Sequence, residues 1–203
     1  MAKERLKSPR VRLFVALDLP AEVRNRIVAW GDDALSDPAL RPVSPQALHI
    51  TLAFLGWRWE REVPRAAEIV HRIRIAGPPR IELAAEPVGI PPRKPPRLFA
   101  LDAPSEDTVA LQRDIEAELV AAGLYKPEKR PFWSHVTVAR VRKVRGEKRY
   151  MRVERAPPAI PEALRAPFFG VRVTLYRSVL LPAGAEYTPL AQVELPTDEA
   201  AVR

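Results

Sequence analysis

The sequence predicts an α+β protein of two related lobes, each a small, mostly antiparallel sheet backed by helices. Two observations predict this fold class. Several short motifs occur twice, separated by nearly the same number of residues, and each copy runs through strand, helix and second strand in the same order. The chain has 203 residues, 47% of them hydrophobic, which suits one domain made of two closely packed lobes.

Paired motifs define the repeat. Arg12 opens R-L-F-V-A-L-D-L-P, and Arg97, 85 positions later, opens R-L-F-A-L-D-A-P. His49 opens H-I-T-L-A-F, and His135, 86 positions later, opens H-V-T-V-A-R. An Arg-Pro pair precedes each of these histidines, at 41–42 and 130–131.

These motifs predict a single bilobal domain over residues 1–203. Repeat one covers about 11–94, and repeat two covers about 95–195. The polar ends, 1–10 and 196–203, are expected to be flexible tails.

The first repeat begins with an apolar strand at about 11–19. Apolar residues at helical spacing then predict a helix at 21–35, and the His-x-Thr strand follows at 49–54. A second helix at 61–75 and a strand at 80–90 complete the repeat.

The second repeat begins with a strand at 97–103. A helix at 105–123 follows, with Ser105 at its N-terminus and Gly123 where a helix stop belongs. Residues 91–96, P-P-R-K-P-P, cannot form a helix or a central strand, so we expect a stiff connector between the halves.

A basic segment follows the second His-x-Thr strand, which lies at 135–140. Residues 142–167 are rich in charge and proline, with a short helix expected at 161–166. Two interpretations stay open: a mobile flap that covers a binding cleft and grips the phosphates of a polyanion, and a solvated surface loop. Strands at 169–181 and 187–195 end the repeat.

Each His-x-Thr strand is expected to have two faces, because successive side chains of a strand point to opposite sides. His49 and Thr51 share one face, as do His135 and Thr137. The opposite faces carry the apolar residues that enter the core: Ile50, Leu52 and Phe54 in the first strand, and Val136 and Val138 in the second.

The two polar faces can converge on one cleft if the lobes pack about a pseudo-twofold axis. Two imidazoles and two hydroxyls would then surround a tetrahedral phosphate, with Thr51 and Thr137 donating hydrogen bonds to its oxygens. One imidazole can take a proton from water while the other gives one to the departing oxygen, because the unperturbed pKa of histidine is about 6.5.

A metal site is the alternative. Catalytic zinc usually has three protein ligands, whereas each motif histidine has a threonine beside it rather than a carboxylate. The third histidine, His71, lies in a predicted helix and is expected at a solvated or half-buried position. The chain has no cysteine, and Ser134 points away from the face of His135. We therefore expect no metal, no cofactor and no side-chain nucleophile.

The charge balance favours a polyanion as partner. The formal net charge is +8, which fits nucleic acid, although an ordinary basic protein is the alternative. No apolar run approaches the roughly 20 residues that span a bilayer, and the first ten residues contain no apolar stretch of signal-peptide length. We expect a soluble, cytoplasmic monomer that does not associate with membranes.

Five segments spread over most of the chain carry a family pattern: R-L-F-V-A-L-D-L-P near the start, H-I-T-L-A-F-L-G at 49–56, P-R-L-F-A-L at 96–101, R-P-F-W-S-H-V-T-V-A-R at 130–140 and L-Y-R-S-V-L-L-P-A-G-A-E-Y-T-P-L at 175–190. In these segments the sequence resembles the 2H phosphoesterase superfamily, and more closely its RNA 2′,3′-cyclic phosphodiesterases, also called 2′-5′ RNA ligases. Two departures from that pattern are Ser134, where the family usually has proline, and Ala53, where it often has a basic residue.

The resemblance implies a bilobal fold and a metal-independent reaction. It gives His49 the role of proton donor and His135 that of proton acceptor. The implied substrate is RNA with a terminal 2′,3′-cyclic phosphate, which is opened to a 2′-phosphate. The reverse reaction would join RNA ends through a 2′-5′ linkage without ATP.

Four further residues are candidates for substrate binding. Arg130 matches the family's arginine ahead of the second motif and is expected at the terminal phosphate. Strict alternation places Arg140 on the face of Val138, away from the motif histidine, so a bulge or twist would be needed to turn it toward substrate. Phe14 and Tyr187 are candidates to stack on the terminal base, with core packing as the alternative for Phe14.

Two other functions stay open at this point. The first is an RNA-binding module on the same scaffold without catalysis, against which the two intact His-x-Thr motifs argue. The second is a cyclic phosphodiesterase that acts on a small nucleotide, although the basic segment at 142–167 favours a longer polyanion.

Overall fold

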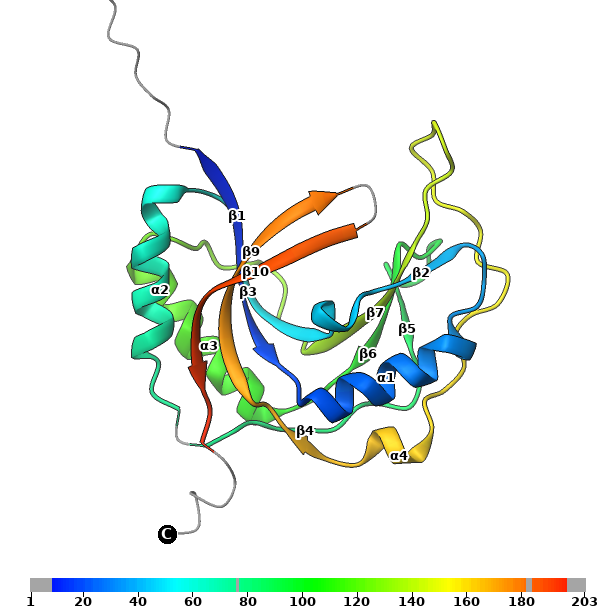
Figure 1. Cartoon of the computed structure of the whole chain (residues 1–203), viewed down its shortest axis with the longest axis horizontal. Helices are drawn as coiled ribbons and strands as arrows, with labels where there is room; N and C mark the ends of the chain where they lie inside the picture. The colour runs from blue at the N-terminus through cyan, green and yellow to red at the C-terminus, as the bar shows by residue number, and fades with distance from the viewer. Residues whose placement is uncertain (1–8, 76, 182–183, 197–203) are drawn as a thin grey trace, which may run out of the picture.

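One antiparallel sheet of eight strands runs through the part of the chain that the computed structural model describes, residues 9–75, 77–181 and 184–196 (Figure 1). Its strand order is β10-β9-β1-β3-β7-β6-β5, with β2 paired to β7. The predicted α+β class is confirmed. The strands are β1 (Arg10–Asp18), β2 (Leu40–Pro42), β3 (His49–Trp59), β5 (Val88–Ile90), β6 (Leu98–Asp102), β7 (His135–Val141), β9 (Arg172–Leu181) and β10 (Gly184–Glu194), while a separate small sheet pairs β4 (Arg80–Ile81) with β8 (Phe168–Phe169).

The helices cover the sheet at two places (Figure 1). Helices α2 and α3 pack together beside β3, β9 and β10, and α1 lies near α4 at the other end of the sheet. Helix α3 has the predicted ends, because the Ser105 hydroxyl accepts a hydrogen bond from the Thr108 N–H at 3.1 Å and Gly123 follows with φ of 68°. The helices are α1 (Ala21–Ala34), α2 (Val63–Arg72), α3 (Glu106–Ala121) and α4 (Glu162–Arg165), with 3₁₀ turns at Pro45–Ala47 and Glu60–Glu62.

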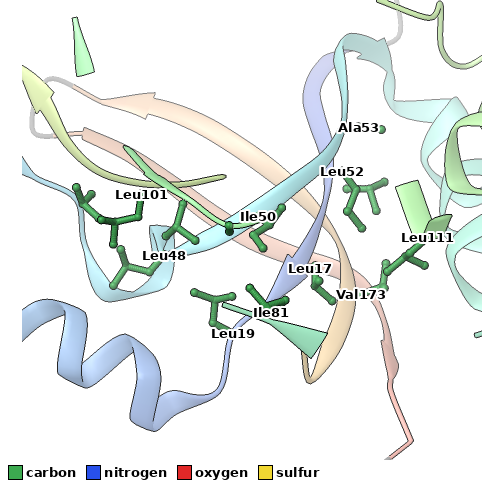
Figure 2. Close-up of a cluster of buried hydrophobic side chains, with 14 of the residues drawn as sticks. Leu17, Leu19, Leu48, Ile50, Leu52, Ala53, Ile81, Leu101, Leu111 and Val173 are labelled. Atoms are coloured by element: carbon green, nitrogen blue, oxygen red, sulfur yellow. The ribbon is translucent and has the colours of Figure 1, made fainter. Parts of the chain in front are cut away.

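The sheet divides into two lobes at the contact between β3 and β7. These strands share one registered residue pair, Ile50 opposite Val136, and both side chains are fully buried. Figure 2 shows Ile50 in the buried cluster together with Leu17 and Leu101. We call β10, β9, β1 and β3 the first lobe and β7, β6, β5 and β2 the second lobe. The two motif strands therefore lie side by side where the lobes meet.

Each lobe contains strands from both sequence repeats. In the first lobe, β9 pairs with β1 and β10 pairs with β9, and both strands come from the second repeat. Strands β2 and β5, which precede residue 95, pair with β7 and β6 in the second lobe. The two halves of the sequence are thus interleaved in the sheet.

The proline-rich segment joins the two halves of the sequence and forms neither helix nor strand, as predicted. Residues 91–96 form the turn between β5 and β6, which pair antiparallel, and the Arg97 N–H donates to the Ile90 carbonyl at 2.6 Å. Prolines lack the N–H that a strand ladder requires, so this run occupies the turn. The strand predicted at 80–90 is instead two short strands, β4 and β5, which belong to different sheets.

The basic segment after β7 is tied to the body of the protein at several points. Lys143 and Tyr150 form an isolated bridge within the segment, and the Ile160 N–H donates to the Ala85 carbonyl of the body at 2.8 Å. The Asp37 carboxylate accepts hydrogen bonds from the backbone N–H groups of Glu154 and Arg155, both at 2.9 Å. The bond from Arg155, followed by those from the Ala39 and Glu154 N–H groups, holds the pKa of Asp37 below its usual value. The short helix predicted at 161–166 is confirmed as α4.

Two more predictions concern the ends of the chain and the membrane. Residues 1–8 and 197–203, which form most of the predicted tails, lie outside the described residues, whereas Arg10 pairs with Trp59 in the sheet. In the described ranges, no helix is both long and apolar enough to cross a bilayer.

Candidate active site

A cavity of about 440 Å³ lies where the two motif strands meet. Its size falls within the range of small-molecule sites. Both His-x-Thr pairs line it, so the predicted convergence of the two polar faces is present in the structure. The lining residues used below are Arg12, Phe14, Arg41, His49, Thr51, Phe54, His135, Thr137, Arg140 and Tyr187.

A β-bulge in β3 turns Phe54 into this cavity. Across the β1–β3 ladder, Ala16 pairs with Thr51 and Val15 pairs with Ala53, so Leu52 is an extra residue. An extra residue reverses the alternation beyond it. Phe54 therefore shares the face of His49 and is 41% exposed, and its predicted place in the core was wrong.

The same bulge places Ala53 on the core face, where it is 2% exposed. Its side chain therefore does not face the cavity. The cavity receives its arginines from other positions.

An equivalent bulge in β7 turns Arg140 toward the cavity. Ala100 pairs with Thr137 and Phe99 pairs with Ala139, so Val138 is the extra residue. Beyond it, Arg140 shares the face of His135 and lines the cavity. Strict alternation would have placed Arg140 on the opposite face. The bulge at Val138 reverses the alternation and brings the Arg140 side chain to the cavity.

His49 lies in a buried aromatic environment. Its ring stacks on Phe14 with centroids 5.0 Å apart, and Tyr187 meets it edge-on at 5.5 Å. Burial lowers the pKa of His49 to about 4, although the negative charge of Asp18 and the backbone of Gln46 act in the opposite direction. Its Nδ1 atom is buried with no well-aligned hydrogen-bond partner in the described part of the chain. These surroundings therefore favour the neutral imidazole.

Asp18 is the cross-strand partner of His49 and was missed from the sequence. It is 2% exposed and is held by three donors: Arg172 Nε at 2.9 Å, Thr174 Oγ1 at 2.8 Å and the Tyr176 hydroxyl at 2.9 Å. Burial, followed by the charge of Asp18, raises the pKa of Tyr176 to about 12, so the phenol is a neutral donor. These three donors hold the Asp18 carboxylate beside His49.

His135 is oriented by Trp133. The two rings stack with centroids 4.1 Å apart, and His135 Nδ1 lies 2.7 Å from the Trp133 carbonyl oxygen. A carbonyl can only accept a hydrogen bond, so Nδ1 carries the hydrogen and Nε2 keeps a free lone pair. Burial lowers the pKa of His135, with the Trp133 carbonyl and Asp102 acting against it. These features suit a proton acceptor.

Asp102 occupies the same position in the second repeat as Asp18 in the first. It is the cross-strand partner of His135 and accepts a hydrogen bond from the Trp133 indole at 2.8 Å. The two aspartates end the duplicated stretches R-L-F-V-A-L-D and R-L-F-A-L-D. That duplication was the signal in the sequence that could have identified both.

Arginines line the mouth of the cleft. Arg41 of β2 is the cross-strand partner of Arg140, and both side chains line the cavity together with Arg12. Like charges on facing residues repel each other, and an anion bound between them would relieve that repulsion. A second cavity of about 470 Å³ adjoins the first, with Arg41, Arg140 and Tyr187 in both walls. Arg41 was missed as a site residue, although it belongs to one of the two Arg-Pro pairs.

Of the remaining predicted residues, some line the cleft and others lie apart from it. Tyr187 lines both cavities, and Phe14 is only 4% exposed, behind His49. Arg130 is exposed and is not among the described residues that line the cleft. His71 is exposed on α2, apart from the cleft. Ser134 is 5% exposed, and its buried Oγ has no hydrogen-bond partner among the described residues.

The donor set at the cleft does not resemble a metal site. Within the described ranges, no three side chains of histidine, aspartate or glutamate are grouped so as to hold a metal ion. The groups that line the cavity are imidazoles, hydroxyls, guanidiniums and aromatic rings.

Known proteins are similar to this chain over nearly its whole length. Residues 19–176 match the model of the 2′-5′ RNA ligase superfamily. An RNA 2′,3′-cyclic phosphodiesterase of Thermus thermophilus is 32% identical over 191 residues, which cover 91% of this chain and 90% of the relative. The Escherichia coli protein of the same name is 28% identical, with 88% of this chain and 93% of the relative covered.

Solved structures agree with these sequence matches. A crystal structure of a Thermus thermophilus protein has a TM-score of 0.75 at 30% identity and covers 91% of this chain and 97% of that chain. The structure of E. coli LigT complexed with 3′-AMP has a TM-score of 0.70 at 27% identity, with 93% of this chain and 100% of that chain covered. The repeated motif, the shared cavity and these matches together show that the chain belongs to the 2′-5′ RNA ligase superfamily.

Proposed function

We propose that this protein hydrolyses the terminal 2′,3′-cyclic phosphate of RNA to a 2′-phosphate. The observation that carries the proposal is that two histidines from a duplicated motif line one cavity together with Thr51, Thr137 and Arg140. Relatives that match most of the chain are named RNA 2′,3′-cyclic phosphodiesterase. LigT has been crystallised with 3′-AMP, a nucleotide whose phosphate is bonded to O3′ of the ribose, one of the two oxygens of the cyclic phosphate.

The proposed reaction needs two proton transfers and one bond exchange at phosphorus. His135 takes a proton from water through Nε2 as the water oxygen bonds to phosphorus. The bond from phosphorus to O3′ breaks, and His49 gives its proton to O3′. The products are a 3′-hydroxyl and a 2′-phosphate. Each such proton transfer typically contributes about 10²–10⁴ in rate.

His49 can act as a proton donor despite its lowered pKa, because a bound phosphate favours the protonated ring. Burial favours the neutral ring in the free protein. A bound phosphate anion favours the imidazolium, because an opposite charge nearby raises the pKa of a base. The arginines and threonines hold the phosphate oxygens in this scheme, so the histidines are left for proton transfer.

We further infer a metal-independent enzyme that acts as a cytoplasmic monomer. Both histidine motifs come from a single chain and line a single cavity, so a second copy is not needed to complete the site. In a parallel reaction, a 5′-hydroxyl would take the place of water in the attack on the cyclic phosphate, O3′ would depart as the 3′-hydroxyl, and a 2′-5′ linkage would form without ATP.

The direct test is incubation with an oligoribonucleotide that ends in a 2′,3′-cyclic phosphate, in the presence of EDTA. The expected product carries a 2′-phosphate, and EDTA leaves the rate unchanged. His49→Ala and His135→Ala should each lower kcat/KM by about 10²–10⁴. His71→Ala is the matched control because His71 is exposed on α2.

Other outcomes would favour other functions. Full activity in either motif variant overturns the two-histidine mechanism. Tight RNA binding without turnover would indicate an RNA-binding module, and turnover restricted to mononucleoside cyclic phosphates would indicate a small-molecule enzyme.

A further inference from the structure

The face of the sheet that carries His49 continues beyond the cleft as a row of arginine and tryptophan side chains. Across the β1–β3 ladder, Phe14 pairs with Phe54, Arg12 with Trp57, and Arg10 with Trp59. Directly opposed residues of two strands share a face, and alternate residues of β1 share it too. We call Phe54, Arg12, Trp57, Arg10 and Trp59 the β1–β3 stripe.

The arginines of this stripe lie over its aromatic rings. The Arg12 guanidinium is 4.6 Å from the Phe54 ring centre, and that of Arg10 is 4.9 Å from the Trp59 ring centre. Arg61 lies over Trp59 at 5.6 Å. In the described part of the chain, the ion pairs do not involve any of these three arginines. Their charges are therefore not neutralised by carboxylates of the described chain.

Two aromatic residues of the stripe are unusually open to solvent. Trp57 is 57% exposed and Phe54 is 41% exposed, although large aromatic side chains are normally well buried. The nearby carboxylates have other partners. Glu60 lies 4.0 Å from Arg177, and Glu62 accepts a hydrogen bond from the Trp59 backbone N–H at 2.6 Å.

The stripe is continuous with the active-site cleft. Its inner residues, Arg12 and Phe54, line the same cavity as His49 and His135. Its outer residues, Arg10 and Trp59, lie at the far end of the β1–β3 ladder. A chain whose end reaches the histidines can therefore leave the cleft along this face.

We propose that the stripe binds the single-stranded RNA that precedes the terminal nucleotide, with a base stacked on Trp57 and phosphates facing Arg10 and Arg12. The inference rests on the proposed function, because it assumes that the RNA end is in the cleft. Single-stranded RNA is bound by aromatic rings that stack on bases and by basic groups that track the backbone. The net charge of +8 matches such a partner.

The length of the stripe sets the number of nucleotides. Phe54 and Trp59 lie opposite Phe14 and Arg10, which are four positions apart on β1, so the stripe is about 13 Å long at roughly 3.3 Å per strand residue. At about 3.4 Å between stacked bases, this distance accommodates about four nucleotides. The substrate is thus an oligonucleotide end with a single-stranded stretch of about this length, and not an isolated nucleotide.

Binding can be tested without catalysis. A single-stranded hexaribonucleotide with a 3′-hydroxyl is titrated into the protein at fixed salt, and tryptophan fluorescence and the anisotropy of a labelled hexamer are followed. Trp57→Ala should raise Kd about 5- to 100-fold, the range that base–aromatic stacking supplies. Val120→Ala, which removes an exposed apolar side chain on α3, is the matched control and should keep the wild-type Kd.

An abasic hexamer of the same charge separates stacking from charge attraction. Binding of the abasic hexamer should be weaker than that of RNA and insensitive to Trp57→Ala. Equal Kd values for RNA and the abasic hexamer overturn the stacking role. An unchanged Kd for RNA in both Trp57→Ala and Arg10→Ala overturns the stripe as a binding surface.

Turnover gives a second, separate readout. In the wild type, kcat/KM should rise as substrates with a terminal cyclic phosphate are lengthened from one to five nucleotides. The double variant Arg10→Ala/Trp57→Ala should lose most of that rise, whereas Arg72→Ala/Val120→Ala, at exposed positions on α2 and α3, should keep it. A wild-type rate that does not depend on length contradicts the stripe. If no cyclic phosphate is hydrolysed at all, the proposed function fails, and the hexamer titration still decides the stripe.

Discussion

Phe54 and Arg140 occupy equivalent positions in the two motif strands, five residues after His49 and His135, and each faces the cleft because one residue of its strand bulges. The bulges at Leu52 and Val138 fall directly after the two threonines. The same backbone device thus supplies an aromatic ring on one side of the cleft and a guanidinium on the other. The duplicated motif extends beyond its histidine and threonine to this third position.

Arg140→Ala should lower kcat/KM for a cyclic-phosphate substrate about 10- to 100-fold. A charged hydrogen bond to phosphate contributes roughly 1.5–3 kcal/mol, and each 1.4 kcal/mol changes the rate about tenfold. Steady-state kinetics with one oligonucleotide measures the change. Arg72→Ala, at an exposed position on α2, should have the wild-type value. If Arg140→Ala also has it, Arg140 does not contact the phosphate.

Asp102→Asn should lower the pKa of His135 further. The asparagine keeps an acceptor for the Trp133 indole but removes the negative charge that favours the imidazolium of His135. The chain has only three histidines, so NMR titration of the imidazole protons resolves each one. An unchanged His135 pKa in the variant would show that the Asp102 charge has no influence.

The free energy of unfolding should decrease as the pH falls from about 6.5 to about 4. The pKa of His49 is about 4 in the folded protein and 6.5 in the reference state, so within this window the unfolded chain binds more protons. The stability due to neutral His49 is therefore present above pH 6.5 and lost as the pH falls. A shift of this size corresponds to about 3 kcal/mol.

Urea unfolding at pH 7 and pH 4.5 measures this effect. The loss of unfolding free energy at pH 4.5 should be about 2–3 kcal/mol greater in the wild type than in His49→Gln, and His71→Gln should behave as the wild type. Equal losses in all three proteins would show that His49 is not held neutral by burial.

The alkaline limb of kcat should lie at higher pH than the alkaline limb of kcat/KM. The first reports the enzyme–substrate complex and the second the free enzyme. A bound phosphate favours the imidazolium of His49, so its pKa rises in the complex. Rates between pH 4 and 9 provide both profiles. Coincident limbs would mean that the substrate anion does not reach His49.

Gly170→Ala should destabilise the protein by about 1–3 kcal/mol, the usual cost of overpacking a core. An added Cβ would lie 2.6 Å from Leu17 Cδ1, and Leu17 is fully buried. Thermal unfolding measures the effect. The control is Gly77→Ala, where an added Cβ meets no described atom within 4 Å. Equal Tm values for the two variants would show that Leu17 can move aside.

The sequence predicted the parts of the fold that follow from regular alternation and helical spacing. The long strands β1, β3, β7 and β9 and the helices α1, α2 and α3 were all expected near their observed positions. Short strands such as β2 and β4 have too few residues for a visible pattern. The pairing of β5 with β6 across a proline-rich turn also could not be derived from local composition.

The site was predicted where the duplication is visible and missed where the backbone departs from regularity. Both His-x-Thr pairs line one cavity, as two matching strand faces predicted. A bulge leaves no mark in a pattern of apolar and polar residues, so Phe54 was placed in the core and the face of Arg140 was left open. Asp18 is separated from His49 in the sequence, and only the sheet register makes them partners.

The residues that hold Asp18 are synthesised after both histidine motifs. Arg172, Thr174 and Tyr176 lie 154, 156 and 158 positions beyond Asp18. Proteins are synthesised from the N-terminus, and contacts between distant residues slow folding. A nascent chain that has not yet produced β9 therefore contains both histidine motifs before the donors that hold Asp18 exist, so the surroundings of His49 are completed only after residue 176 has been made.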